Sequence, residues 1–595
     1  MPGCLIRVRT TKRVYSKSLY RYPRIIACLL LTAMPLPVAA DAVVVEIEGI
    51  SGGMLENART MLSLSRYDPD EVSEVRVRRL HARAPAEIAT ALQPFGYYRP
   101  RVESELRRHN GAWRARYVVD PGAPVRLTRV DLELLGAGAD DPVLRQVLRG
   151  FALQPGDTAD QRAYDRGRDS LRRRALERGY LDARFEVRRI TVDPESLEAT
   201  ITLHLDTGER YRFGEVRLFQ EILDDALVRR FVPFAPGDDY HRRDLLNMQY
   251  RLDDSDYFSR VEVEPRRDLA EDNAVPIDVY LAPRPRYRYT FGIGYGTDTG
   301  PRTRLGWQNR RVNRRGHQLA GDLTLSQVIQ GITQRYTIPI ADPATDHVTL
   351  RAGVVRERPE DRESTTQNLG VTHSRTFGRW QRALRLDLER ERFDLGDGLE
   401  STTSLLLPGI GVTYTRADHR IYPTRGLRWN IDLKGAHTDL GSDLSFVQLY
   451  TELRYVHQLH PRGRLLLRGE AGGSSVEEFA ELPISQRFFA GGDRSVRGFR
   501  YKSLGPVDDD GLVVGGKYLL TSSVEYEYRF AGNWAAAVFH DAGNAFDDTD
   551  EELARAAGVG LRWRTPVGPL GIDLARTLNL DDNRYRFHLS LGATF

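Results

Sequence analysis

Alternation of apolar and polar residues through the second half of the chain is the feature that most restricts its fold. The segment YRFHLSLGATF at residues 585–595 shows it best, because every second side chain is apolar and those between are polar or small. Such alternation places apolar side chains on one face of a β-strand and polar ones on the other. The pattern therefore predicts a sheet with one face in an apolar environment and the other in water.

Sixteen such segments can be marked between residues 287 and 595, at about 19 residues per strand and turn. This spacing is typical of membrane-barrel strands of roughly 10 residues joined by alternating short and long loops. On one segment Arg385, Asp387 and Glu391 share a face, which suits a wet lumen and would be costly against lipid. A soluble sandwich also alternates, but the even strand count together with an export leader favours a transmembrane β-barrel.

The first 40 residues are predicted to be a secretory signal peptide. Seven basic residues precede an apolar stretch at 25–38, and small residues end at Ala40, where cleavage is expected. This leader has no acidic residue, so its removal takes the formal charge from +4 to −3, and we expect no nucleic-acid partner. Both cysteines, Cys4 and Cys28, lie in the leader, which leaves the predicted mature chain without disulfides or thiolate metal sites.

A weak repeat of about 80 residues occupies the chain between the leader and the barrel. Each copy closes with an aromatic turn and a hairpin, and Tyr97, Tyr180 and Tyr257 align at spacings of 83 and 77 residues. Each copy predicts the order β-α-α-β-β. The free edge of such a small sheet can pair with an extended peptide, although a rigid spacer explains the repeat equally well. The predicted boundaries are 1–40 for the signal peptide, 41–123, 124–209 and 210–286 for three front domains, and 287–595 for the barrel.

Catalytic and metal-binding motifs such as HExxH, GxSxG, a P-loop or spaced Cys/His sets are not found in the sequence. The glycines of FGIGYG at 291–296 suggest a nucleotide fingerprint, but they lie in a predicted strand without a following helix. The acidic residues at 508–511 and 547–548 lack the rest of a calcium loop. We therefore expect no enzyme activity, no metal and no cofactor.

A short motif in a long inter-strand segment is the first candidate site. It reads Val496-Arg497-Gly498-Phe499, and the segment between the flanking strands is long enough to fold back into a barrel. Arg497 is permanently charged and planar, so it needs acceptors if it leaves water. Gly498 would allow a sharp turn beside the wall.

A second motif, FHDAG at 539–543, lies on a predicted strand and supplies those acceptors. Alternation places Phe539, Asp541 and Gly543 together on one face, which can be the lumen. Asp541 can accept hydrogen bonds from the arginine, and Phe539 offers a ring for cation–π contact. Glu525, on the preceding strand, is a second candidate acceptor. The resulting lock either stabilises the barrel or takes part in transport.

The two motifs resemble the VRGF/Y and FxDxG signatures of the POTRA-barrel superfamily of outer-membrane assembly and secretion proteins. Three front domains make the chain similar to the TamA subfamily, the outer-membrane subunits of the translocation and assembly module. BamA-type insertases carry five such domains, and two-partner secretion transporters carry two. Further TamA-like segments lie at 291–307, 312–319, 336–343 and 558–575. The resemblance implies three POTRA-like domains in the periplasm before a 16-stranded antiparallel β-barrel in the bacterial outer membrane.

The function that this resemblance implies is non-enzymatic. Such a protein helps insert or translocate unfolded outer-membrane client proteins, autotransporters in particular, within outer-membrane lipid. A TamB-like inner-membrane and periplasmic partner is expected to dock on the first front domain. The alternatives are a two-partner-type secretion pore for one dedicated exoprotein and a BamA-like general insertase. A passive porin is disfavoured, because porins need no front domains.

The resemblance also implies a lateral gate between the first and last barrel strands. Gly292, Gly294 and Gly296 on the first strand, and Gly592 on the last, would weaken side-chain packing there. A weak seam can exchange strand pairing with a client. The glycines can instead relieve crowding by the lumen loop or by the third front domain. The terminal aromatic residue, Phe595, is the expected C-terminal assembly signal.

Overall fold

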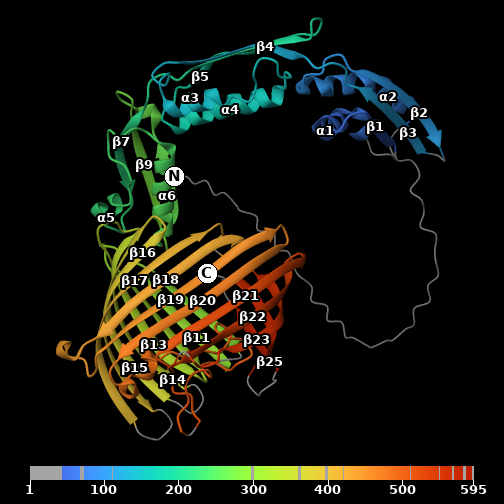
Figure 1. Cartoon of the computed structure of the whole chain (residues 1–595). Coiled ribbons are helices and arrows are strands. Elements are labelled where there is room, and N and C mark those ends of the chain that lie inside the picture. Colours follow the sequence, from blue (N-terminus) through green and yellow to red (C-terminus); the bar gives the residue numbers. More distant parts are fainter. Residues whose placement is uncertain are drawn as a thin grey trace, which may run out of the picture. The chain divides into compact units, whose positions relative to one another are not determined.

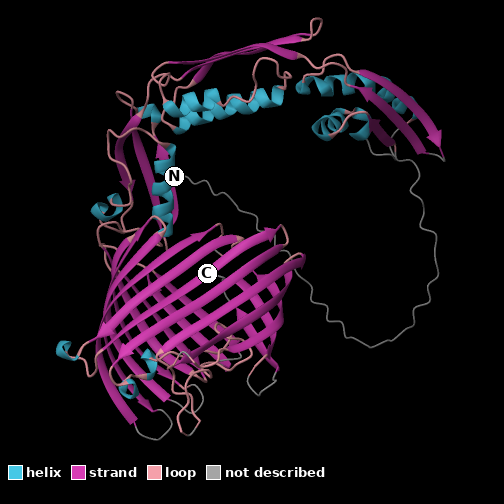
Figure 2. Cartoon of the chain, in the orientation of Figure 1, coloured by secondary structure: helices cyan, strands magenta, loops and turns pink. Residues whose placement is uncertain are grey.

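The protein is described by a computed structural model that places four β-sheets along the chain (Figures 1 and 2). The described residues are 43–66, 73–109, 112–296, 300–358, 363–394, 400–419, 421–509, 511–548, 550–565, 568–579 and 585–591. Two compact units are formed, and the second contains both the third small sheet and the sixteen-stranded sheet. None of the helices among these residues is both long enough and apolar enough to cross a membrane.

Each front domain has the expected β-α-α-β-β order. The first contains β1 (Val44–Glu48), α1 (Gly52–Met61), α2 (Glu74–Leu92), β2 (Arg101–His109) and β3 (Ala112–Asp120). The second contains β4 (Arg126–Leu135), α3 (Pro142–Arg149), α4 (Gln161–Glu177), β5 (Arg184–Asp193) and β6 (Glu198–Asp206). The third contains β7 (Arg212–Phe219), α5 (Asp225–Arg229), α6 (Arg242–Asp254), β8 (Phe258–Pro265) and β9 (Ala274–Pro283). The sheet orders are β1-β3-β2, β4-β6-β5 and β7-β9-β8, so the last strand is central in each.

Amphipathic helices cover one face of these small sheets. Along α2, Val77, Leu80, Ala84 and Ile88 recur at helical spacing and are buried. They pack with Tyr117 of β3, which is also fully buried. Each small sheet lies within one of the three predicted front domains. The exact boundaries of these domains stay predictions.

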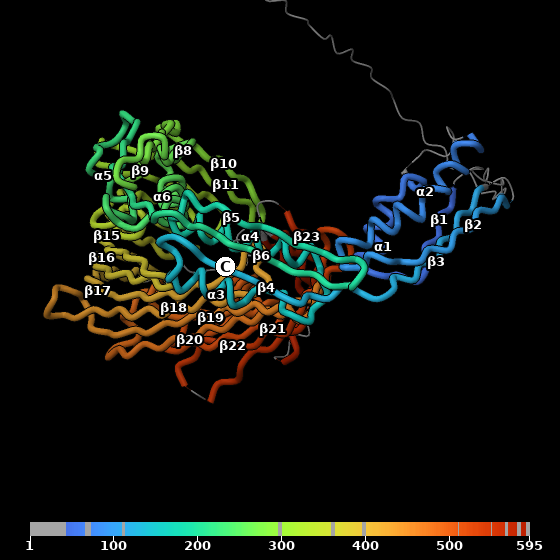
Figure 3. Tube along the Cα trace, turned by 90° about the horizontal axis from the view of Figure 1, so that it is seen from above, coloured from blue at the N-terminus to red at the C-terminus, as the bar shows by residue number. Residues whose placement is uncertain are grey.

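The second half of the chain forms one antiparallel sheet of sixteen strands in sequence order, as the alternation predicts. The first eight strands are β10 (Tyr287–Gly296), β11 (Gly300–Asn309), β12 (Gln318–Ser326), β13 (Ile329–Pro339), β14 (Asp346–Glu357), β15 (Glu363–Phe377), β16 (Trp380–Asp394) and β17 (Glu400–Ala417). The others are β18 (Arg425–Ala436), β19 (Phe446–His460), β20 (Gly463–Val476), β21 (Tyr518–Ala531), β22 (Trp534–Phe546), β23 (Ala554–Thr565), β24 (Gly568–Thr577) and β25 (Tyr585–Leu591). Figure 3 shows successive strands following one another around the wall.

The sheet curls into a nearly closed barrel. The first and last strands, β10 and β25, approach within 8 Å between Cα atoms. Among the described residues, however, no backbone ladder joins them, and the pairing runs from β10 to β25 without a closing bond. The barrel therefore has a seam with two strand edges.

Side chains alternate between the two faces of the barrel as the sequence predicts. On β16, Leu384, Leu386 and Leu388 point outward and are about half exposed. The intervening Arg385 and Asp387 lie on the lumen face, where they form ion pairs with residues two strands away, on β18 and β14 respectively. The charged row is therefore inward, and the outer face is apolar.

The third front domain is held against the turns at one end of the barrel. Arg251 Nη2 lies 2.5 Å from Asp342 Oδ1, and the Tyr257 hydroxyl donates a hydrogen bond to the carbonyl oxygen of Gly316. Burial raises the pKa of Tyr257 to about 12, so its hydroxyl keeps the proton that it donates. These contacts identify the end of the barrel that adjoins the third front domain.

Candidate functional site

The long segment between β20 and β21 is folded back on itself. Backbone hydrogen bonds join Phe488 with Gly516 and Ala490 with Leu504, at 2.8–3.0 Å. Val496 is fully buried in a cluster formed by these side chains and by apolar residues of the wall. The VRGF tip is therefore anchored inside the barrel by a small apolar core of its own.

Arg497 makes a two-pronged ion pair with the wall. Its Nε and Nη2 donate to the two carboxylate oxygens of Asp541 at 2.7 and 2.9 Å, and its backbone N–H donates to Oδ2 at 3.0 Å. The side chains of Arg497 and Asp541 are only 6% and 0% exposed. A planar guanidinium suits such paired recognition of a carboxylate, and a lysine could not reproduce it.

Two further wall residues complete the surroundings of the Arg497 guanidinium. Glu525 Oε2 accepts a hydrogen bond from Nη1 at 2.6 Å. The Phe539 ring lies under the guanidinium, with its centroid 3.4 Å from Cζ. The same ring covers Gly558, where a Cβ atom would lie 2.3 Å from it. Gly558 is thus needed to make room for the ring.

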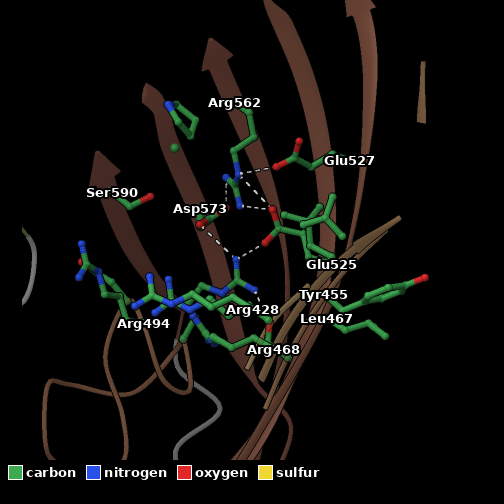
Figure 4. Close-up of a pocket in the computed structure, with 18 residues that line it drawn as sticks. Arg428, Tyr455, Leu467, Arg468, Arg494, Glu525, Glu527, Arg562, Asp573 and Ser590 are labelled. Atoms are coloured by element: carbon green, nitrogen blue, oxygen red, sulfur yellow. Dashed lines mark hydrogen bonds and ion pairs between the residues drawn. The ribbon is translucent and has the colours of Figure 1, made fainter. Parts of the chain in front are cut away.

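A second arginine continues the network along the wall. Arg562 of β23 donates to Glu525 Oε1 at 2.8 Å and to Asp573 Oδ1 at 2.5 Å (Figure 4). Asp573 of β24 also lies 3.4 Å from Arg497 Nη1. The two arginines therefore alternate with carboxylates from three strands. In such a buried network the loss of one member leaves an opposite charge without a partner.

The loop tip also contacts the last strand. The backbone N–H of Gly498 donates to Nε2 of His588 at 2.8 Å, and Nδ1 of His588 is hydrogen-bonded to Asp493. Acceptance at Nε2 requires the proton to be on Nδ1, which then donates to the carboxylate. Gly498 has a φ of +98°, which favours glycine at this turn. One side of the seam is therefore tied to the loop.

The structure thus brings together most of the residues that the two motifs supplied. Phe499 is half-buried and packs on the apolar cluster. Gly543 serves a close approach of β22 to β21, since a Cβ there would lie 2.6 Å from the Leu520 carbonyl oxygen. Sequence reasoning missed Arg562 and Asp573, although alternation along their strands would have placed both on the lumen face.

The seam glycines of β10 face open space. A Cβ at Gly292 would meet only the carbonyl oxygen of Arg304, at 3.9 Å, and one at Gly294 only the side chain of Arg302. Among the described residues, no atom of the lumen loop or of the third front domain lies within 4 Å of a Cβ at Gly292 or Gly294. Gly296 pairs with Gly300 across the β10–β11 hairpin. The predicted positions Gly592 and Phe595 lie outside the described residues.

A cavity of about 510 Å³ lies beside the loop tip (Figure 4). Six arginines line it together with acidic residues of the network: Arg428, Arg454, Arg468, Arg494, Arg497 and Arg562. The polar lining shows that the space beside the loop tip is suited to water. The loop tip is therefore bordered by the wall on one side and by polar space on the other.

Comparison with known proteins places these features in a family. Residues 286–595 match the Omp85 superfamily domain, and residues 44–121 match the POTRA domain described as TamA domain 1. A 200-residue stretch is 29% identical to the outer membrane protein assembly factor BamA of Nitratidesulfovibrio vulgaris strain Hildenborough and covers 31% of this chain and 25% of that protein. A 229-residue stretch is 26% identical to BamA of Neisseria meningitidis serogroup B and covers 31% of this chain and 28% of that protein. The matches thus span about a quarter of the length of these curated relatives.

A solved structure shares the fold. The crystal structure of BamA from Haemophilus ducreyi lacking POTRA domains 1–3 superposes with a TM-score of 0.65 at 18% sequence identity. The superposition covers 78% of this chain and 99% of that chain. The Omp85 match spans more than half of the chain. It coincides with the sixteen-stranded sheet, and the front domains precede it. The chain therefore belongs to the Omp85 superfamily, as an outer-membrane β-barrel whose POTRA domains lie in the periplasm.

Proposed function

We propose that the protein is a non-enzymatic assembly factor that helps insert or secrete other outer-membrane proteins, autotransporters in particular. The observation that carries this proposal is the seam, where β10 and β25 face each other without a closing ladder among the described residues. Backbone N–H and C=O groups without partners are costly in a bilayer. An incoming strand can satisfy them by pairing with the open edge, which is strand addition.

The geometry of β10 supports this use of the seam. Its outward side chains Tyr289, Phe291 and Ile293 are 69–78% exposed, so that face suits lipid. Its inward positions include Gly292 and Gly294, whose lumen side is unobstructed. A client strand that pairs with β10 would therefore meet no side-chain barrier on the lumen side.

The lumen loop is proposed to set the state of this seam. Arg497 holds the loop tip to β21, β22 and β24, and Gly498 joins it to His588 of β25. The last strand is therefore fixed to the loop, while β10 has no such contact in the described residues. Release of the tip would free one edge of the seam, and retention would brace it.

A TamB-like periplasmic partner is proposed to dock on the first POTRA domain. The match of residues 44–121 to a TamA-type first domain supports this choice. In the first domain's own sheet, β2 lies at an edge and pairs only with β3, so it offers free backbone groups to an extended segment. The named likeness to BamA supports a second candidate, a general insertase that works with other partners.

Co-purification and client assembly test the proposal. We expect the protein, extracted from its own membranes after brief crosslinking, to carry a large TamB-like partner. We also expect its loss to slow the appearance of heat-modifiable, folded autotransporter. A set of lipoproteins in place of the TamB-like partner would favour the general insertase. Unchanged assembly of every outer-membrane protein tested would contradict both candidates.

A further inference from the structure

The outer face of strands β14 to β17 changes abruptly from apolar to polar along the strands. Two successive rows of cross-strand neighbours are apolar: Leu350, Val371, Leu386 and Pro408, then Ala352, Leu369, Leu388 and Leu406. The next two rows contain the first charges: Val354, Gln367, Arg390 and Ser404, then Arg356, Thr365, Arg392 and Thr402. The apolar band of the barrel therefore ends between Leu388 and Arg390.

This polar zone lies at the extracellular edge of the membrane. The third POTRA domain contacts the turns that precede β12 and β14, through Gly316 and Asp342. Those turns are therefore periplasmic, and Arg390 and Arg392 lie near the opposite end of β16. They stand at the height where headgroups of the outer leaflet meet the apolar band.

A groove of about 810 Å³ is present at this height, and we call it the rim groove. Three arginines and three acidic residues line it: Arg356, Arg390, Arg392, Glu363, Asp394 and Glu400. Arg390 and Arg392 are two residues apart on one strand face, about 7 Å along the strand, and Arg356 lies two strands away, about 10 Å. The side chains of Arg390 and Arg392 can thus reach one anionic group.

The three arginines of the rim groove differ in whether they form ion pairs. Arg392 Nε lies 3.2 Å from Glu400, but both side chains are more than 60% exposed. Arg356 is paired with Glu363. Arg390 is exposed and, within the part of the chain that the structure describes, has no hydrogen-bond or ion-pair partner. Its guanidinium is therefore free to bind phosphate oxygens, which match its planar donor geometry.

We propose that the rim groove binds the phosphorylated headgroup of an outer-leaflet lipid. Arg390 and Arg392 contact the phosphate, and the acyl chains lie on the leucines of the apolar rows directly below. Gln367 and Thr365 offer further hydrogen bonds between the arginines. The site is independent of the seam and of the lumen loop, so it would stand even if the proposed assembly role failed.

Native mass spectrometry of the full mature chain in detergent tests the proposal, with bis-phosphorylated lipid A as the probe. We expect Arg390→Gln/Arg392→Gln to weaken lipid A binding about tenfold or more, because paired arginine–phosphate contacts are lost. Arg416→Gln is the matched control, since Arg416 is an exposed arginine on the same outer face at the periplasmic edge. It should leave binding unchanged. Heat-modifiable migration on gels verifies that each variant is folded.

Two further arms identify the ligand. Lipid A stripped of its phosphates should bind as weakly to the natural protein as lipid A binds to the double variant. Sodium phosphate at tenfold molar excess should not displace lipid A, because the headgroup is held together with its acyl chains. Equal binding by the double variant, an equal loss in Arg416→Gln, equal binding of the stripped lipid, or displacement by free phosphate would each overturn the proposal.

Discussion

Arg497 shows how one side chain can organise a barrel lumen. It is a buried charge, and its stability depends on carboxylates supplied by other strands, of which Asp541 is fully buried. Removal of either partner of such a pair leaves the other charge without compensation, which typically costs about 3–5 kcal/mol. The adjoining polar cavity can admit water, which would reduce that cost.

A double-mutant cycle tests this contact. Arg497→Ala and Asp541→Ala should each lower the free energy of unfolding, and the double variant should lose about 0.5–3 kcal/mol less than the sum of the two. The measurement is urea unfolding of the purified protein, monitored by its heat-modifiable migration on gels. Arg494→Ala, at an exposed position of the same loop, serves as control and should have little effect. Full additivity would mean that Arg497 and Asp541 do not interact.

His588 is the second informative residue, because it joins the loop to the last strand. His588→Phe keeps a ring but removes the acceptor for the Gly498 N–H and the donor to Asp493. We expect faster hydrogen exchange at the loop tip and at β25, with the β21–β22 hairpin unchanged. Hydrogen-exchange mass spectrometry makes this measurement. Equal exchange in the natural protein and the variant would show that His588 does not hold the strand.

At the scale of elements, the third POTRA domain and the barrel turns meet through polar contacts and through packing of Ala344 on the core of that domain. The Tyr257 hydroxyl is buried and donates to Gly316. Tyr257→Phe removes this hydrogen bond but keeps the ring, and we expect a loss of about 1 kcal/mol in the free energy of unfolding. Arg243→Gln, at an exposed position on α6, is the control.

The same contact predicts a pH dependence. Burial raises the pKa of Tyr257 to about 12, so the folded state retains a proton that the unfolded state loses near pH 10. The contribution of Tyr257 is therefore constant below about pH 10 and declines as the pH rises toward 12. The difference in stability between the natural protein and Tyr257→Phe should shrink over that range. A difference that stays constant to pH 12 would contradict the burial of this hydroxyl.

At the scale of the whole molecule, alternation and spacing were enough to predict the barrel and its sixteen strands. Both are local properties of the chain, since period 2 follows from strand geometry. Alternation likewise placed Asp541 and Glu525 on the lumen face. The contacts of His588 and Asp573 could not be predicted in this way. They lie 90 and 76 residues from their loop partners, and alternation gives the face of a strand but not its height against a neighbour.

The proposed function requires the seam to open, and the predicted mature chain is suited to crosslinking because both cysteines of the sequence lie in the predicted leader. Cysteines at Ile293 of β10 and Phe587 of β25 can be bridged by a bifunctional thiol crosslinker, since both side chains are exposed near the extracellular ends of the seam strands. The control joins Leu384 and Ile410, which are direct neighbours on β16 and β17.

The measurement is the rate at which folded autotransporter appears before and after crosslinking. Closing the seam should stop client assembly, and reductive release of a cleavable crosslinker should restore it. The control crosslink and each single-cysteine variant should assemble clients at the natural rate. Undiminished assembly with the seam fully crosslinked would show that clients do not use the seam.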